Sequence, residues 1–233
     1  MVSAATDKMG SLWDVQTGER IKKLRGHKAL LNGCAAATRS QQLFSTVSDD
    51  GEIRIWDSRV KLPVASLSNN FVPVTAVCFG AGDEQLFTGG VDNVIKVWDI
   101  RKQAVAYKLA GHTDTVTGLR LSPDGAYLLS NSMDETVRMW DVKPFSQSRF
   151  VKHFEGATHG NEKQLIRCAW SPDGSKVVAG GGDRSVNVWD VMTRKLLYKL
   201  PGHKGCVIDV DFHPKEPIVA SAGADKQIFL GEI

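Results

Sequence analysis

The 233-residue sequence lacks long apolar runs and strong net charge. No apolar run approaches the 18 or so residues of a membrane-spanning helix, and residues 1–5 lack the basic start and apolar stretch of a signal peptide. These absences predict an intracellular protein without a membrane partner. The net charge of +3 is too small and too evenly spread to argue for nucleic-acid binding on electrostatics alone.

Paired cysteines are also lacking. The four cysteines stand far apart in apolar segments, at Cys34, Cys78, Cys168 and Cys206. Without a Cys-x-x-Cys pair, neither a zinc site nor a redox couple is indicated, and buried reduced thiols are the simplest interpretation. No histidine has a ligand partner at metal spacing, so we predict no metal and no cofactor.

A repeat of about 42 residues organises the chain. Trp-Asp recurs at residues 13–14, 56–57, 98–99, 140–141 and 189–190, and the last interval is about seven residues longer than the others. Between the Trp-Asp pairs lie short β-branched runs separated by turn sequences such as Pro123-Asp124-Gly125. Four such runs fit each repeat, and no segment has helical periodicity, so an all-β fold is predicted.

Polar residues recur at fixed distances from each Trp. An Asp stands six residues before it, a Ser or Thr stands four residues before most of these Asp residues, and Gly-His precedes three of the repeats. This pattern resembles the WD40 β-propeller family, in whose blades Asp, His, Ser or Thr and Trp form a hydrogen-bonded tetrad. In this sequence Ala179 breaks the Ser/Thr series and Asn70 takes one His position. The predicted structural tetrad residues are His27, Thr46, Asp50, Trp56, Thr88, Asp92, Trp98, His112, Ser130, Asp134, Trp140, Asp183, Trp189, His203, Ser221 and Asp225.

The repeat predicts a single propeller domain over residues 1–233. The boundaries are a partial blade 1–27, blades 28–69, 70–111, 112–157 and 158–202, and a partial last blade 203–233. Three strands, four sets of four and three strands give about five and a half blades. Because the family resemblance implies seven, we predict an incomplete arc that begins downstream of the true start or is covered by a partner. A six-bladed ring with two three-stranded blades is the alternative.

The surplus in the long repeat falls between Pro144 and Lys163, and residues 152–160 are predicted to be an irregular loop. A partner contact and a mere spacer remain equal interpretations of it.

A catalytic interpretation of the recurring Ser, His and Asp fails, because a hydrolase triad needs one exceptional nucleophile and this set repeats. We therefore predict no enzyme and no small-molecule substrate. Partner contacts are expected on the loop rim that propellers of this family use. The residues predicted there are Thr6, Asp49, Phe71, Val91, Met133, Gly182 and Ala224.

Several longer strings are similar to the WD-repeat proteins of the spliceosomal U5 small nuclear ribonucleoprotein (snRNP). They lie at residues 90–99, 127–134, 137–145, 197–203 and 231–233. This resemblance implies a nuclear scaffold in pre-mRNA splicing that binds the Prp8-type protein and other U5 snRNP or tri-snRNP proteins, with RNA contacted indirectly. The alternative is a substrate receptor of a cullin-type ubiquitin ligase, because Arg59 and Arg101 complete Trp-Asp-x-Arg strings. An aromatic and basic platform for RNA is not evident in the sequence.

Overall fold

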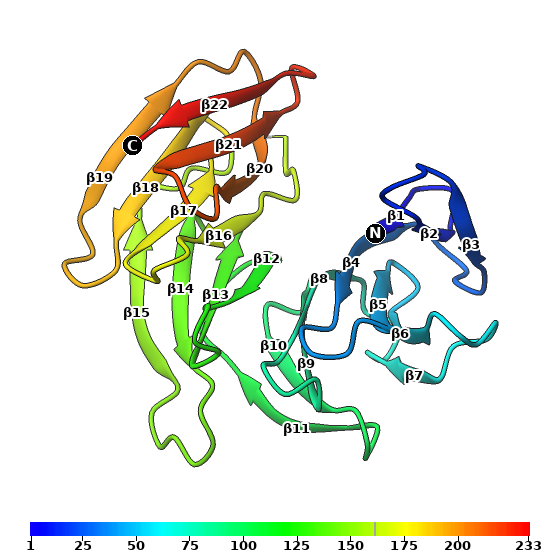
Figure 1. The fold of residues 1–233 in the computed structure, drawn as a ribbon. Coiled ribbons are helices and arrows are strands. Elements are labelled where there is room, and N and C mark those ends of the chain that lie inside the picture. Colours follow the sequence, from blue (N-terminus) through cyan, green and yellow to red (C-terminus); the bar gives the residue numbers. More distant parts are fainter. Residues whose placement is uncertain (161) are drawn as a thin grey trace. The chain divides into compact units, whose positions relative to one another are not determined.

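The computed structural model describes residues 1–160 and 162–233, and every regular element among them is a β-strand (Figure 1). The chain forms two compact units, Met1–Gly111 and His112–Ile233. In the described residues no helix is long and apolar enough to cross a membrane.

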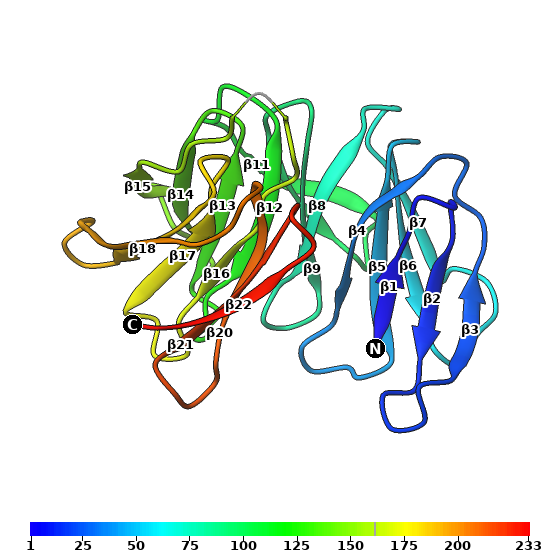
Figure 2. The ribbon, with the colours of Figure 1, turned by 90° about the horizontal axis from the view of Figure 1, so that it is seen from above.

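The first unit contains three antiparallel sheets, which stand beside one another in Figure 2. We call each sheet a blade and number the blades in chain order. Blade 1 has three strands, β1 (Val2–Ala4), β2 (Gly10–Trp13) and β3 (Arg20–Leu24). Blade 2 has four, β4 (Leu31–Ala36), β5 (Leu43–Ser48), β6 (Glu52–Asp57) and β7 (Ala65–Ser68). Blade 3 has four, β8 (Val74–Phe79), β9 (Gln85–Gly90), β10 (Ile95–Asp99) and β11 (Ala104–Leu109).

The second unit contains the other three antiparallel sheets. Blade 4 is formed by β12 (Val116–Leu121), β13 (Tyr127–Ser132), β14 (Thr136–Asp141) and β15 (Phe150–Glu155). Blade 5 is formed by β16 (Cys168–Trp170), β17 (Lys176–Gly180), β18 (Ser185–Asp190) and β19 (Leu196–Pro201). Blade 6 has three strands, β20 (Val207–Phe212), β21 (Ile218–Gly223) and β22 (Ile228–Glu232). The strand numbers per sheet in the described residues are those that the repeat predicts.

Blades 2 to 5 bury the middle strands of their sheets and expose much of the outer strand. Val178 and Val188 are fully buried on β17 and β18, whereas β19 is exposed along most of its length. Within each unit, apolar side chains of neighbouring blades meet between the sheets, and one such cluster joins Val137 and Phe154 of blade 4 to Val177 of blade 5. Burial of these faces between sheets is the main contribution that holds each unit together.

The expectation for residues 152–160 is wrong in its first half. Residues 152–155 belong to β15, which pairs with β14 from Thr136↔Glu155 to Trp140↔Phe150. The strand forms because Phe154 is fully buried between blades 4 and 5, which outweighs the polar character of its neighbours. Irregular backbone begins at Gly156. Asn161, in the predicted surplus, lies outside the described residues.

Candidate functional site

Thr46 is the centre of a buried chain of hydrogen bonds in blade 2. Trp56 Nε1 donates to Thr46 Oγ1 at 2.9 Å, and His27 Nε2 lies 2.8 Å from the same oxygen. His27 Nδ1 lies 3.0 Å from Asp50 Oδ2. These partners assign the tautomer: Nδ1–H donates to the carboxylate, and Nε2 accepts from the threonine hydroxyl. Each buried polar group therefore has a partner.

The carboxylate at the end of this chain also accepts backbone hydrogen bonds. Lys28 N donates to Asp50 Oδ2 and Glu52 N donates to Asp50 Oδ1, both at 2.8 Å. Asp50 therefore joins the segment that enters the blade to the turn between β5 and β6. The network therefore holds the loops around Lys28 and Glu52 as well as the buried side chains of blade 2.

Blade 4 repeats this geometry. Trp140 Nε1 donates to Ser130 Oγ at 2.8 Å, His112 Nε2 lies 2.7 Å from that oxygen, and His112 Nδ1 lies 2.7 Å from Asp134 Oδ2. Asp134 also accepts from the Thr136 hydroxyl at 2.6 Å. All four predicted residues of this blade meet in one network.

Burial and hydrogen bonding set the charges in these networks. Burial lowers the pKa of His27 and His112 below the ordinary 6.5, and it outweighs the opposing effect of the Asp partner. Burial alone would raise the pKa of Asp134, but hydrogen bonds from His112 and Thr136 lower it well below its ordinary range. Neutral imidazole beside ionised carboxylate is therefore the stable state.

Blade 3 builds its network with lysine. Trp98 Nε1 donates to Thr88 Oγ1 at 2.8 Å, as Trp56 and Trp140 donate to a hydroxyl in blades 2 and 4. Lys96 Nζ lies 2.6 Å from Asp92 Oδ2 and also donates to the side-chain oxygen of Asn69. Asn70, which was expected to replace the histidine, is exposed at φ 52°, and the buried amide is that of Asn69. In the sequence, this lysine network is indicated only by Lys96, which lies opposite Thr88 on the neighbouring strand.

Blade 6 has the histidine but no tryptophan. His203 Nε2 lies 2.9 Å from Ser221 Oγ, and His203 Nδ1 lies 3.1 Å from Asp225 Oδ2. The Phe229 ring meets the imidazole edge to face, with centroids 4.6 Å apart. Blade 1 has the tryptophan but no histidine partner among the described residues. Its Trp13 Nε1 donates to Ser3 Oγ at 2.8 Å.

Blade 5 departs furthest from the pattern. Ala179 offers no hydroxyl, so Trp189 Nε1 donates to the backbone oxygen of Glu155 at 2.9 Å. Asp183 pairs with Lys199 Nζ at 2.6 Å. Both amide atoms of Asn187 and both ring nitrogens of His159 are buried without a hydrogen-bond partner.

The predicted rim residues share one backbone contact. In five of them the N–H donates to a carbonyl of the segment that enters the blade: Asp49 to Leu30, Val91 to Pro73, Met133 to Thr115, Gly182 to Thr158 and Ala224 to Cys206. Their surroundings differ. Thr6, Asp49, Val91 and Ala224 are exposed, as is Phe71, whereas Met133 is half-buried. At Gly182 a side chain would meet the backbone oxygen of His159, so this position offers backbone only.

The two Trp-Asp-x-Arg arginines are already engaged. Arg59 Nη2 lies 2.6 Å from Asp57 Oδ2, and its hydrogen bonds lower the pKa of Asp57 to about 2. Arg101 pairs with Glu84 at 2.9 Å. Arg59 therefore pairs with the Asp of its own Trp-Asp string, whereas Arg101 pairs with a carboxylate outside its string.

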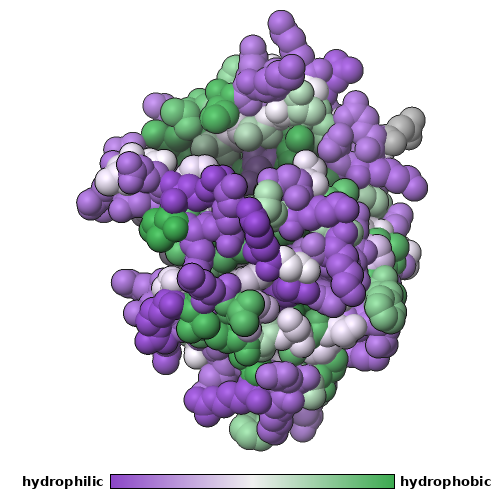
Figure 3. All heavy atoms as spheres, turned by 90° about the vertical axis from the view of Figure 1, so that its right-hand side faces the viewer, coloured by the Kyte–Doolittle hydropathy of each residue, from purple (hydrophilic) through white to green (hydrophobic). Residues whose placement is uncertain are grey.

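Apolar side chains lie in separate patches among hydrophilic ones on the face drawn in Figure 3.

Comparisons with known proteins agree with the repeat. A model of the family described as "WD domain, G-beta repeat" matches residues 18–57, 61–99, 104–141, 149–190 and 194–230. The chain also matches a chain in "Crystal Structure of Mitotic Checkpoint Complex" with a TM-score of 0.86 and 18% identity, over 100% of this chain and 70% of that one. That likeness shows the fold, an all-β propeller fold built from WD repeats.

Curated relatives are closer in sequence. The chain is 52% identical over 221 residues to the Homo sapiens "U5 small nuclear ribonucleoprotein 40 kDa protein", covering 94% of this chain and 62% of that protein. It is 48% identical over 233 residues to the Dictyostelium discoideum protein of that name, covering 99% and 65%. It is 44% identical over 222 residues to the "Pre-mRNA-splicing factor cwf17" of Schizosaccharomyces pombe, covering 95% and 65%. The chain thus spans a little under two thirds of the length of these relatives.

Proposed function

Because the chain belongs to the WD40 family, we propose that it is a non-enzymatic scaffold of the U5 snRNP in pre-mRNA splicing. Its partners would be the Prp8-type protein and other proteins of the U5 snRNP or tri-snRNP, and its place of action the nucleus. The observation that carries this proposal is the 52% identity over 94% of the chain to a U5 snRNP protein.

The geometry fits a binding role. The polar networks of blades 2 and 4 tie the entering segment to the β5–β6 and β13–β14 turns through Asp50 and Asp134. Side chains on these turns are therefore held in fixed positions, which lowers the entropy lost when a partner binds. A catalytic site needs one nucleophile with a distinct environment, whereas these Ser or Thr, His and Asp residues form the same hydrogen-bonded frame in several blades.

On the loop rim, Phe71 and Val91 supply the apolar contacts of the proposed surface. Phe71 is 84% exposed at φ 63°, and Val91 is 49% exposed. Large apolar side chains held outward are typical anchors of protein interfaces. Thr6 and Asp49 are the other contacts proposed on the first unit. Met133, Gly182 and Ala224 are the contacts proposed on the second unit, Gly182 through its backbone alone.

The test is purification of a tagged chain from nuclear extract. We expect U5 RNA and the Prp8-type protein to co-purify, and Phe71→Ala combined with Val91→Ala to reduce their recovery. Both side chains are exposed, so the double variant should melt at the parent temperature. Recovery of neither U5 RNA nor the Prp8-type protein with the parent chain would sink the proposal.

The ubiquitin-ligase alternative is tested in the same extract. Arg59→Ala with Arg101→Ala would abolish recovery of the ligase adaptor if the chain were a substrate receptor. On the splicing proposal, adaptor is absent from the parent sample and the splicing proteins are recovered equally with the variant.

A further inference from the structure

The loop between β14 and β15, residues 142–149, presents an aromatic ring to solvent. Phe145 is 97% exposed, and its backbone has φ 63°. A left-handed conformation in a bulky residue persists only where the surrounding structure imposes it. The outward position of this ring is therefore a property of the loop.

Hydrogen bonds at the base of the loop hold its two ends together. Arg149 Nη1 donates to the backbone oxygen of Lys143 at 2.8 Å and to that of Asp141 at 3.3 Å. Asp141 Oδ1 accepts from the backbone N–H of Lys143 at 2.9 Å. The loop is braced from both ends, so Phe145 is pre-organised.

A second aromatic group follows on β15. The Phe150 and His153 rings stack with centroids 6.3 Å apart and an interplanar angle of 23°. Phe150 is 44% exposed, and the Arg138 guanidinium lies 5.8 Å from its ring centroid. His153 bonds Glu155 at 3.1 Å at the far end of the strand. The hairpin β14–β15 thus carries aromatic rings at its tip and on its outer strand.

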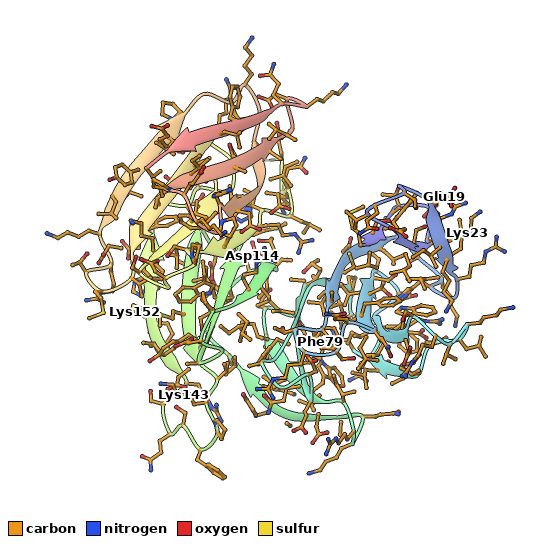
Figure 4. All side chains as sticks on the ribbon, in the orientation of Figure 1. Glu19, Lys23, Phe79, Asp114, Lys143 and Lys152 are labelled. Atoms are coloured by element: carbon orange, nitrogen blue, oxygen red, sulfur yellow. The ribbon has the colours of Figure 1, made fainter. Side chains whose placement is uncertain are left out.

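Lysines flank these rings. Lys143 is exposed and lies over the Tyr127 ring, 4.7 Å from its centroid. Figure 4 labels Lys143 by the loop and Lys152 on β15. Lys152 Nζ donates to the backbone oxygen of Val191 at 2.7 Å, so β15 contacts the loop between β18 and β19 on the face opposite to His153.

That second loop adds two exposed cations, Arg194 and Lys195. The carboxylates at the bases of both loops are used internally. Asp190 Oδ1 accepts from the backbone N–H of Thr193 at 2.6 Å, as Asp141 accepts from Lys143. The charge that the two loops turn outward is therefore positive.

We infer that the outer edge of blades 4 and 5 binds single-stranded RNA directly, through the rings of Phe145 and Phe150 and the cations of Lys143, Arg194 and Lys195. Exposed rings offer stacking platforms to unpaired bases, and the cations contact the phosphates between them. An acidic protein segment would engage the cations without needing stacked rings, so the rings favour RNA. A duplex keeps its bases stacked on each other and leaves the rings unused. The inference goes beyond the proposed scaffold role, in which RNA is contacted through partner proteins.

The test measures fluorescence anisotropy of a labelled 16-nucleotide mixed-sequence RNA with the purified chain, which separates it from the extract experiment. We expect the single strand to bind more tightly than its duplex. Phe145→Ala should weaken binding about 5-fold or more, because stacking of one base is worth about 1–3 kcal/mol. Leu62→Ala is the control, because it removes an exposed apolar side chain from the corresponding loop of blade 2, between β6 and β7, and it should leave the affinity unchanged.

The lysines are tested through salt dependence. Lys143→Gln with Lys195→Gln should lower the slope of log affinity against log salt by about 1.4, since each contact to single-stranded phosphate contributes about 0.7. Lys61→Gln with Lys102→Gln, in the corresponding loops of blades 2 and 3, is the control and should leave the slope unchanged.

Three results would overturn the inference. The first is no binding of the single strand by the parent chain, and the second is undiminished binding by Phe145→Ala. The third is competition by a 16-residue polyglutamate as effective as that by unlabelled RNA, which would assign the surface to an acidic protein segment. Equal melting temperatures of parent and variants exclude misfolding as the cause of any loss.

Discussion

Blades 4 and 5 are neighbours that share the Trp-Asp frame but anchor it differently. In blade 4, Trp140 Nε1 reaches the hydroxyl of Ser130, which continues to His112. In blade 5, Trp189 Nε1 reaches the backbone oxygen of Glu155, and Ala179 stands where the hydroxyl would be. The buried indole therefore requires an acceptor, and the sheet can supply it from the backbone of the neighbouring blade.

The same pair of blades differs in a buried asparagine. Asn131 in blade 4 donates from Nδ2 to the backbone oxygen of Ile166 at 3.2 Å and accepts from Ser132 N at 3.1 Å. Asn187 in blade 5 is equally buried, but neither of its amide atoms has a partner. Blade 4 thus satisfies its buried polar groups where blade 5 does not.

The largest effect is expected when blade 4 is given the alanine of blade 5. Ser130→Ala leaves Trp140 Nε1 and His112 Nε2 buried without a partner, so we expect it to lower the free energy of unfolding by about 2–4 kcal/mol. Urea unfolding of parent and variant measures the difference.

Ala179→Ser is the reciprocal control. Trp189 already has an acceptor, so the new hydroxyl is expected to change the free energy of unfolding by less than about 1 kcal/mol. Equal losses in the two variants would show that the hydroxyl of blade 4 contributes nothing beyond the local packing.

A smaller effect of opposite sign distinguishes the two asparagines. Replacing Asn187 by leucine removes two unpaired polar atoms and keeps the side-chain size, so Asn187→Leu is expected to raise the free energy of unfolding by about 1 kcal/mol. Asn131→Leu breaks two hydrogen bonds and leaves the Ile166 oxygen without this donor, so we expect a loss of about 2 kcal/mol. The same urea series compares them. A loss in both variants would mean that Asn187 is satisfied in solution.

The spacing of Trp, Asp and Ser or Thr was enough to predict the fold and most of the polar network. These positions recur with the strand register, and in blade 4 Ser130 pairs across the sheet with Arg138 while Trp140 follows two residues later. Periodicity therefore places them together before any tertiary contact is known.

Contacts between loops and between blades were not predictable in this way. In blade 3 the long side chain of Lys96 bonds Asp92, as the histidine does in other blades. Its second partner, Asn69, stands one residue before the position at which the repeat places the histidine. The aromatic surface on β14–β15 was missed because Phe150 and His153 stack only once β15 forms, in a segment whose polar sequence indicated a loop. Such contacts depend on backbone conformation and leave no periodic signal.

The smallest expected effect is a change in the pH dependence of stability. Burial lowers the pKa of His112 below its ordinary 6.5, so below about pH 6.5 the unfolded chain binds a proton that the folded chain does not. Stability is therefore expected to fall as the pH falls from 6.5 through the lowered pKa of the folded state. The depressed pKa of Asp134 adds a second loss as the pH falls below about 3.8. Melting temperatures from pH 7 to pH 3 should show both steps.

His112→Gln is the control variant. It should only partly flatten the loss of stability between pH 7 and pH 5, because burial lowers the pKa of His27 and His159 as well. It should leave a loss below pH 4 through Asp50, whose pKa is also lowered. An unchanged slope between pH 7 and pH 5 in this variant would mean that His112 accepts its proton in the folded chain, and the imidazole of blade 4 would then be a charged partner of Asp134.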